Sequence, residues 1–392
     1  MKTILTSNPS FENLISNDYL YVDKTNILYD LITNGNTFFF CSRPHCFGKT
    51  MILSTLEAIF QGKKELFKGL KIYGTDYDWK EYPVIHLNLS LLMCASSREE
   101  LERSLNNKVS YIAKEYGAPF DRSYDCYMNL DCLISYLGKK SEVVVLIDEY
   151  DKMLLSGLNK PEIEEMRSAL WGFFEILKAD SEYIRFLLIE GVTRFTQISV
   201  FSSINNLYDI SLDKRYSALF GYTEEEVKHY FSEYIEEGMK KTGLSYDEYM
   251  EKLRKNYGGY RFAPRQKETL YNPVSIGLFF SDGGECFDNY WIETGGMQVL
   301  MDVTKKVSFD ITKDVATKIS REKITVFDIL SMAKTNISLT SYRSLLFQTG
   351  YLTIKGIDED CSNLLILDFP NEEVARTYAK RLLPMCLKEN EA

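Results

Sequence analysis

Short apolar runs separated by longer helical segments constrain the fold of this chain more than any other feature. The runs are TFFFCS (37–42), VIHLNLS (84–90), EVVVLID (142–148), IRFLLIEGV (184–192) and a candidate fifth, LYDIS (207–211). Nearly continuous apolar runs of this length are typical of parallel strands, which are covered on both faces. Helical periodicity appears between them at 97–116 and at about 161–179, the latter starting at Pro161. The sequence therefore predicts an α/β fold with a doubly wound, mainly parallel sheet.

The segment SRPHCFGKT (42–50) connects the first predicted strand to an apolar helix. Gly48, Lys49 and Thr50 complete the phosphate-loop pattern G-x-x-x-x-G-K-[ST], although Arg43 stands where the first glycine is usual. A glycine lets the backbone approach a phosphate, and a helix N-terminus offers N–H groups that the helix itself does not use. Lys49 is predicted to reach the β- and γ-phosphates, and the Thr50 hydroxyl to bind Mg²⁺. The alternative is a chance G-K-T at a helix start.

Two acids, Asp148 and Glu149, end the third apolar run. A carboxylate at the end of a buried strand costs desolvation free energy unless it has a partner, and a hydrated Mg²⁺ is such a partner. Asp148 is predicted to hold the ion through water, and Glu149 to orient and deprotonate an attacking water. The alternative is that both acids only terminate a strand at the surface. Asp151, two residues further on, either supports the site residues from behind or is a solvated acid, and a solvated acid is expected.

Thr193 and Arg194 follow the fourth run. In phosphate-loop enzymes with an extra strand between the two motifs, a polar residue on that strand contacts the γ-phosphate or the attacking water, and Thr193 fits this place. Arg194 is either a finger that neutralises developing charge or the partner of a nearby acid. Arg215 is a weaker second candidate for the finger. The catalytic candidates are thus Lys49, Glu149, Thr193 and Arg194.

Further motifs extend along nearly the whole chain. In order they are YVDKT (21–25), SRPHCFGKT (42–50), ELFKGLKIY (65–73), VVVLIDEYDKML (143–154), GVTRFTQISVFSSINNLYDISLD (191–213), LFGYTEEEV (219–227), NYGGYRF (256–262), YNPVS (271–275), YWIETG (290–295), TGYLTIKG (349–356) and FPNEEV (369–374). This series resembles the bacterial AAA-ATPase-like proteins. The resemblance implies an ATPase with ATP and Mg²⁺ as ligands, in which hydrolysis drives a conformational change of the C-terminal helical region. It leaves open whether such a change regulates a nuclease or a defence-type effector.

The resemblance also assigns residues to nucleotide binding. In the loop these are Arg43, Pro44, His45, Cys46, Phe47, Gly48, Lys49 and Thr50. The family's loop usually reads R-P-R-R-F-G-K-[ST], which makes Arg43 a family trait. Here His45 and Cys46 replace two arginines, and the change either weakens nucleotide binding or turnover or is simply tolerated.

The segment YVDKT is placed near the adenine by the same resemblance. Tyr21 would stack on the base, and Asp23 or Lys24 would contact the nucleotide or brace the loop. The alternative is that these residues pack the N-terminal segment onto the sheet.

From about residue 213 the chain becomes more helical and charged. Thr223 and Glu226 have the spacing of a capping box at a helix start. The remaining expected elements are a helix over 245–256, two helices within 323–348, and a β-hairpin formed by 350–356 and 363–369. The expected domains are a P-loop ATPase domain (1–212), a lid-like helical domain (213–320) and a winged-helix-like module (321–392).

Relatives of this kind often carry a PD-(D/E)XK nuclease domain, which would begin near residue 390, where this sequence ends. Either the sequence is a shortened form of a longer protein, or it is a natural member of the family without the nuclease.

Composition narrows the class of partner. The formal net charge of −10 gives no global attraction to nucleic acid, so binding of that kind would need a local basic patch. Eight scattered cysteines without a C-x-x-C pair argue against a zinc site and fit a reducing cytoplasm. No apolar run reaches about 18 residues, so no membrane helix is expected. ATP and an unidentified protein are the expected partners, and a homo-oligomer is left open.

Nucleic-acid binding by 335–380 is a third and weaker hypothesis, because the helix TSYRSLLFQTG has just one arginine and a protein contact is favoured. Two other functions fit these features better. The first is an ATP-hydrolysing switch that acts on a partner through residues 213–390, as the intact pair Asp148 and Glu149 favours. The second is a module that binds ATP, hydrolyses it poorly and uses the bound state to present its C-terminal region, as His45 and Cys46 favour.

Overall fold

The computed structural model describes residues 1–5, 10–157, 162–194, 207–291, 322–325 and 339–381. The chain separates into two compact units. The sheet unit comprises Thr25–Ser42 and Leu53–Ile210, and the C-terminal unit comprises Met1–Lys24, Arg43–Ile52 and Ser211–Ala392. Among the residues that are described, no helix has the length and apolarity that crossing a bilayer requires.

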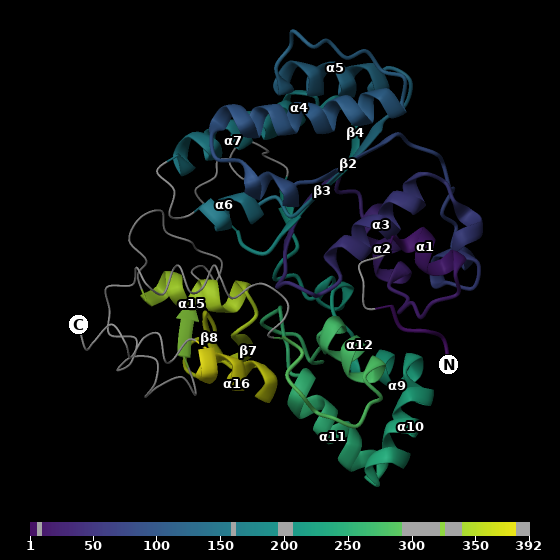
Figure 1. The fold of residues 1–392 in the computed structure, drawn as a ribbon, viewed down its shortest axis with the longest axis vertical. Coiled ribbons are helices and arrows are strands. Elements are labelled where there is room, and N and C mark those ends of the chain that lie inside the picture. The colour runs from purple at the N-terminus through teal and green to yellow at the C-terminus, as the bar shows by residue number, and fades with distance from the viewer. Residues whose placement is uncertain (6–9, 158–161, 195–206, 292–321, 326–338, 382–392) are drawn as a thin grey trace. The chain divides into compact units, whose positions relative to one another are not determined.

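The sheet unit is built on five parallel strands (Figure 1). They are β1 (Phe38–Ser42), β2 (Val84–Asn88), β3 (Val143–Asp148), β4 (Ile184–Gly191) and β5 (Leu207–Asp209). Their order across the sheet is β2-β3-β4-β1-β5, which confirms the predicted parallel sheet. Every residue of β1 and β3 is buried, as continuous apolar runs require. Because β3 and β4 pair in parallel, their carboxyl ends are neighbours at the same edge of the sheet.

Helices precede and follow these strands. In the sheet unit they are α2 (Thr25–Thr33), most of α3 (Lys49–Phe60), α4 (Arg98–Glu115), α5 (Cys126–Gly138), α6 (Lys152–Gly157) and α7 (Ile163–Ala179). Figure 1 shows α4, α5 and α7 together, and these three helices pack against one another. The helix predicted over 97–116 is confirmed as α4, which begins after the N-cap Ser97. The helix predicted from Pro161 is present as α7, whereas Pro161 itself lies outside the described residues, and α5 was not predicted.

The C-terminal unit combines helices with a small antiparallel sheet. Its helices are α1 (Phe11–Ser16), α9 (Glu224–Tyr230), α10 (Ser232–Thr242), α11 (Tyr246–Tyr257), α12 (Pro273–Ser281), α15 (Leu339–Gln348) and α16 (Glu372–Arg381). The strands β6 (Glu322–Thr325), β7 (Thr353–Ile357) and β8 (Leu364–Asp368) pair in the order β6-β8-β7. Short 3₁₀ turns in the chain lie at Lys64–Phe67, Lys71–Gly74, Ser90–Cys94, Ser181–Tyr183 and Ser217–Leu219.

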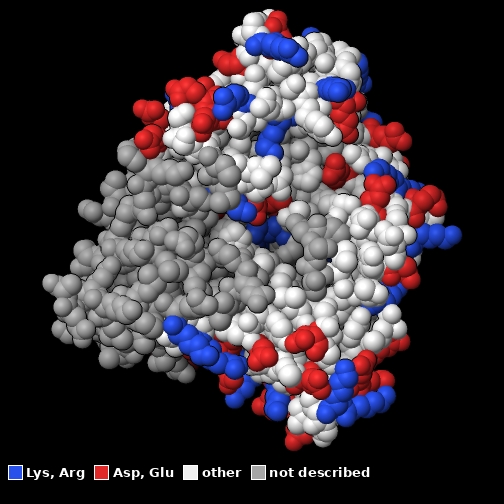
Figure 2. All heavy atoms as spheres, in the orientation of Figure 1, with Lys and Arg blue, Asp and Glu red and all other residues white. Residues whose placement is uncertain are grey.

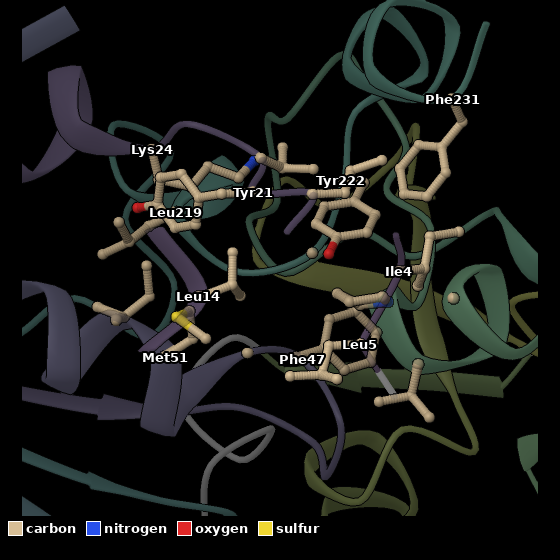
Figure 3. A pocket seen from close by; sticks show the side chains of 18 residues that line it. Ile4, Leu5, Leu14, Tyr21, Lys24, Phe47, Met51, Leu219, Tyr222 and Phe231 are labelled. Carbon is tan, nitrogen blue, oxygen red and sulfur yellow. The ribbon is translucent and has the colours of Figure 1, made fainter. Parts of the chain in front are cut away.

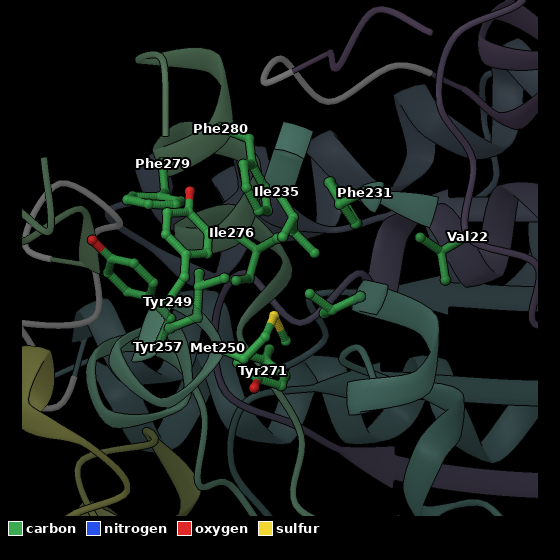
Figure 4. Packing of buried hydrophobic residues seen from close by; sticks show 12 residues of the cluster. Val22, Phe231, Ile235, Tyr249, Met250, Tyr257, Tyr271, Ile276, Phe279 and Phe280 are labelled. Carbon is green, nitrogen blue, oxygen red and sulfur yellow. The ribbon is translucent and has the colours of Figure 1, made fainter. Parts of the chain in front are cut away.

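Aromatic and aliphatic side chains together form a core cluster in this unit, as Figure 4 shows. Phe231 of α9's C-terminal cap stacks on Phe280 of α12, with ring centroids 5.2 Å apart. The neighbouring Phe279 of α12 packs against Tyr249 and Tyr257 of α11. The capping box of Thr223 and Glu226 is present at the start of α9, as predicted.

The C-terminal elements agree only in part with expectation. The predicted hairpin is confirmed as β7 and β8, and residues 339–348 form a helix. The prediction of helix at the start of 323–348 is wrong, because residues 322–325 form β6 and pair with Leu364–Leu367. Four residues are too few to display a helical or strand period, so the distant partner strand decides their conformation. The rest of that prediction, 326–338, lies outside the described residues.

Candidate functional site

The loop between β1 and α3 has the backbone of a tight turn. Gly48 has a φ of +85° and Cys46 one of +67°, and glycine adopts such angles far more readily than cysteine does. The Ile52 N–H donates to the Gly48 carbonyl at 3.0 Å, so α3 begins immediately after Gly48. The first-turn N–H groups of Lys49 and Thr50 are therefore among those that an α-helix does not bond internally. A loop and a helix start in this arrangement suit an anion.

Lys49 is buried and folds back over the loop. Its ammonium group donates to the carbonyl oxygens of Arg43 and Pro44, each at 3.0 Å. The charged end of Lys49 thus lies over the loop backbone, where it can exchange these carbonyl oxygens for phosphate oxygens. His45 and Cys46 are partly exposed on the same loop.

Arg43 serves the loop differently from the glycine that it replaces. Its guanidinium is buried, donates to the Ser211 carbonyl at 2.6 Å, and lies 4.6 Å from the ring centroid of Phe262 and 5.3 Å from that of Phe220. These contacts attach the loop to the part of the C-terminal unit that begins at Ser211. The aromatic partners come from positions more than 170 residues away in the chain, and the sequence carried no signal for them.

A mostly apolar cavity of about 150 Å³ lies beside Gly48 in the C-terminal unit, shown in Figure 3. The segment YVDKT and the loop meet here, because Tyr21 and Lys24 share its wall with Phe47, Gly48 and Met51. Tyr21 also makes an edge contact with Phe11, with centroids 5.1 Å apart. The cavity has the character of a site for a flat, largely apolar group next to a phosphate loop.

Lys24 and Asp23 are tied to the protein. The Lys24 ammonium donates to both carboxylate oxygens of Glu226, at 2.5 and 2.7 Å, and to the Ala218 carbonyl at 2.8 Å. The backbone N–H of Asp23 donates to the Tyr230 hydroxyl at 3.3 Å. Of the alternatives that the sequence left open, these contacts favour a bracing role for Lys24.

In the sheet unit, Asp148 and Glu149 stand at the carboxyl end of β3. Asp148 is fully buried and accepts a hydrogen bond from the Asn88 side chain at 3.2 Å, so it does not merely end the strand at the surface. Glu149 has a φ of +53°, a left-handed conformation that is unfavourable for a residue with a Cβ. Its carboxylate pairs with Lys152 at 2.8 Å. Backbone strain in non-glycine residues is concentrated at functional sites.

The expectation that Asp151 is a solvated acid is wrong. Asp151 is buried and accepts hydrogen bonds from the backbone N–H and hydroxyl of Thr193, at 2.6 and 2.7 Å. It also accepts from the Val192 N–H at 3.0 Å, and the Tyr150 hydroxyl donates to the Thr193 carbonyl at 2.8 Å. Thr193 is thus held rigidly at the end of β4. The error arose because these partners come from a strand about 40 residues later.

The two candidate finger arginines each pair with an acid. Arg194 forms an ion pair with Asp209 at 2.9 Å within the sheet unit. Arg215 pairs with Asp213 at 2.7 Å within the C-terminal unit. Both contacts fit the alternative of an acid partner that the sequence left open for Arg194.

The donor set suits a magnesium ion that arrives with a nucleotide. Among the described residues, no group of three or more His, Cys, Asp or Glu side chains could hold a metal alone. Mg²⁺ does not need such a group, since it keeps several waters and is bound by one or two protein oxygens together with substrate phosphates. In the sheet unit the buried carboxylate of Asp148 offers oxygens of this kind, and in the C-terminal unit the hydroxyl of Thr50 at the start of α3 offers another.

Comparison with known proteins gives two findings. A family described as "Predicted AAA-ATPase" matches residues 7–201. A protein of Azotobacter chroococcum mcd 1, described as an uncharacterized protein in the vnfD 5' region, is 33% identical over 376 residues, which is 95% of this chain and 68% of that relative. The family match contains both the loop and the acids of β3.

Proposed function

The chain belongs to the predicted AAA-ATPase family, and from this premise we propose that it binds ATP with Mg²⁺ and hydrolyses it to ADP and phosphate. The observation that carries the proposal lies at the adjoining ends of β3 and β4. A buried Asp148, a strained Glu149 and a Thr193 held by Asp151 stand together there. Purely structural strand ends have no need of two buried acids and a left-handed glutamate.

The loop residues bind the phosphates in this proposal. Lys49 exchanges the carbonyl oxygens of Arg43 and Pro44 for phosphate oxygens, and the first-turn N–H groups of α3 donate to the same phosphates. The Thr50 hydroxyl and the Asp148 carboxylate would hold Mg²⁺, Asp148 through water. The ion, when bound, neutralises phosphate charge.

Glu149 and Thr193 act on the attacking water. Glu149 orients the water and accepts its proton, and its carboxylate forms an ion pair with Lys152. Thr193 contacts the attacking water, since a hydroxyl that donates its proton to Asp151 can still accept a hydrogen bond from water. A contact with the γ-phosphate would require the hydroxyl to turn away from Asp151. Arg194 is available as a finger only if its pair with Asp209 opens.

The cavity beside Gly48 receives the adenine in this proposal. Tyr21 and Met51 offer apolar surface for the base, and Lys24 braces the wall through Glu226. The sequence has no N/T-K-x-D signature beside a strand, which favours ATP over GTP.

The test compares phosphate release by the wild type and by Glu149→Gln, with binding of a fluorescent ATP analogue measured for both. We expect Glu149→Gln to bind normally and to lose about 10²- to 10⁴-fold in turnover, the usual contribution of a general base. Lys49→Ala is expected to lose binding as well. Equal phosphate release by wild type and Glu149→Gln would refute the hydrolytic role.

A nucleotide-dependent binding module with little hydrolysis is the second candidate. It is favoured by His45 and Cys46 in place of arginines and by the pairing of Arg194 with Asp209. Wild-type protein that binds ATP tightly but releases no more phosphate than Glu149→Gln would support this candidate.

We further propose that 1–212 is the ATPase domain, 213–320 a lid-like domain and 321–392 a winged-helix-like module that contacts a protein. The strand order β6-β8-β7, with α15 before the β7–β8 hairpin, supports this last assignment. Residues 342–348 of α15 are almost entirely buried, which disfavours nucleic-acid contact through this helix. On the visible face in Figure 2, the described acidic and basic side chains are interspersed without a broad basic patch.

A further inference from the structure

The phosphate loop belongs to the same compact unit as the C-terminal half of the chain. Arg43–Ile52 groups with Ser211–Ala392, whereas the strand that precedes the loop groups with the sheet unit. Three loop residues, Arg43, Pro44 and Phe47, have side chains close to residues far along the chain. None of the three carries the chemistry of phosphate binding in the proposed function.

The side chain of Pro44 packs so closely against Gly350 that a side chain at position 350 would overlap it. Gly350 follows α15 and has a φ of +88°. A Cβ built on Gly350 would lie 2.9 Å from the Pro44 Cβ and 3.1 Å from its Cγ, which is closer than ordinary contact allows. The turn before β7 is therefore in direct packing contact with the loop through Gly350 and Pro44.

Phe47 packs its ring against two stacked aromatic residues of the NYGGYRF turn, Tyr260 and Phe262. Its centroid lies 4.8 Å from that of Tyr260 and 5.0 Å from that of Phe262, both in edge-to-face geometry. Phe262 also lies under the Arg43 guanidinium, and all three aromatic rings are buried. The Gly221 N–H donates to the Phe47 carbonyl at 3.2 Å, so the loop backbone is held as well.

The two contact elements are joined to each other. The Arg261 N–H donates to the Thr353 hydroxyl at 2.6 Å, and the Arg261 guanidinium donates to the Lys355 carbonyl at 3.0 Å. The Asn371 side chain donates to the Gly258 carbonyl at 2.8 Å. The NYGGYRF turn and the β7–β8 hairpin therefore form one polar joint, and a displacement of the hairpin would be transmitted to the residues that hold the loop.

We infer that Tyr260, Phe262 and Gly350 are positioning residues that hold the phosphate loop in its nucleotide-binding conformation, and we call these three residues the loop clamp. The inference rests on the proposed nucleotide binding at Lys49 and the start of α3. Its consequence is reciprocal. Whatever displaces the β7–β8 hairpin weakens nucleotide binding, and bound nucleotide resists that displacement by the same free energy.

The test uses two clamp variants, each with a matched control. Gly350→Ala is paired with Gly69→Ala, because Gly69 has the same φ of +88° but an added Cβ there meets nothing within 4 Å. Phe262→Leu is paired with Phe279→Leu, another buried aromatic that belongs to the core cluster of Figure 4. The full chain is used throughout, and Tm is measured for all four variants.

Two readouts are compared for each variant. Hydrogen exchange of the 43–50 peptide is measured without nucleotide, and the Kd of a fluorescent ATP analogue is measured with Mg²⁺. Both clamp variants are expected to raise exchange in the loop severalfold and to weaken binding about tenfold, within the range of known couplings between sites. Gly69→Ala is expected to lower Tm less than Gly350→Ala, because an added Cβ overlaps a neighbour only at Gly350, and Phe279→Leu should lower Tm about as much as Phe262→Leu. Both controls should leave both readouts near the wild type.

Loop exchange and affinity that change no more in the clamp variants than in their controls would overturn the inference. If Gly350→Ala does not fold, Phe262→Leu and its control decide alone. Wild-type protein that binds no nucleotide would defeat the proposed function, while the exchange experiment, which needs no nucleotide, would still show whether the clamp holds the loop.

Discussion

The carboxylate of Asp151 accepts two hydrogen bonds from Thr193, one from the backbone N–H at 2.6 Å and one from the hydroxyl at 2.7 Å. Asp151 follows β3 and Thr193 follows β4, so this contact joins the ends of two neighbouring strands. Gly191 leaves the necessary space, since a Cβ there would lie 2.5 Å from the Asp151 Oδ1. A threonine held at both its N–H and its hydroxyl has one orientation to offer a substrate.

Asp151→Asn is expected to lower the free energy of unfolding by about 2–3 kcal/mol, because hydrogen bonds to a buried charge are lost or weakened. It should also reduce phosphate release while leaving the affinity for an ATP analogue nearly unchanged. Urea unfolding and a phosphate-release assay measure the two effects. Thr193→Ser, which keeps the hydroxyl, is the control and should retain most turnover. Wild-type turnover in Asp151→Asn would contradict the assigned role.

Glu149→Gly is expected to be more stable than Glu149→Ala by about 1 kcal/mol. Both substitutions remove the ion pair with Lys152, but only glycine relieves the left-handed backbone at φ +53°. Neither variant should release phosphate. Thermal unfolding compares the two proteins, and equal Tm values would mean that the backbone at residue 149 is not strained in solution.

Stability should fall between about pH 4 and pH 7 through Asp180. Burial first, and then the neighbouring Asp131, raise the pKa of Asp180 to about 7 in the folded chain. An unfolded aspartate titrates near pH 3.9, so the folded state holds this proton more tightly. The resulting stabilisation is complete below about pH 4 and is lost as the pH rises through 7.

Asp180→Asn removes this dependence, because the amide does not titrate. At pH 8 the free energy of unfolding of the variant, measured with urea, should exceed that of the wild type by an amount on the order of 1–3 kcal/mol. At pH 4 this gain should vanish. Glu373, whose pKa burial also raises to about 7, is unchanged in both proteins and cancels in the comparison. A gain of the same size at both pH values would show that packing, and not ionisation, is responsible.

Lys24→Met and Glu226→Gln should each destabilise the C-terminal unit by roughly 3 kcal/mol. The two side chains are 5% and 17% exposed, and each variant leaves one partner of a buried pair unpaired. The double variant should cost less than the sum of the single variants. A loss of nucleotide affinity in Lys24→Met at unchanged Tm would instead indicate a direct contact with the nucleotide.

The sequence was sufficient for features that are encoded locally. Val143–Ile147 is a run that only a strand covered on both faces accommodates, and every residue of it is buried. Thr223 and Glu226 predicted the start of α9 because a capping box is completed within four residues. The pattern G-K-T likewise located the start of α3, because its three residues are consecutive and lie at the helix start itself.

Contacts between distant segments could not be predicted from the sequence. Nothing in D-E-Y-D indicates that Asp151 binds Thr193, whose place beside it depends on the pairing of β3 with β4. Arg43 was recognised only through a family pattern, and its stacking on Phe262 depends on a turn far along the chain. Residues 323–325, the start of the segment 323–348 predicted as two helices, have a strand character that comes only from pairing with β8.

The position of β1 in the sheet sets an order of events during synthesis. Among the strands that the structure describes, β1 pairs with β4 and β5, and Phe38 must therefore await Leu187 and Leu207 before it has a strand on either side. At the usual rate of translation this interval lasts roughly 8 to 30 seconds. During that time Phe38–Ser42, the most aromatic strand of the sheet, emerges from the ribosome without a partner strand. This nascent segment is where we would look first for chaperone binding.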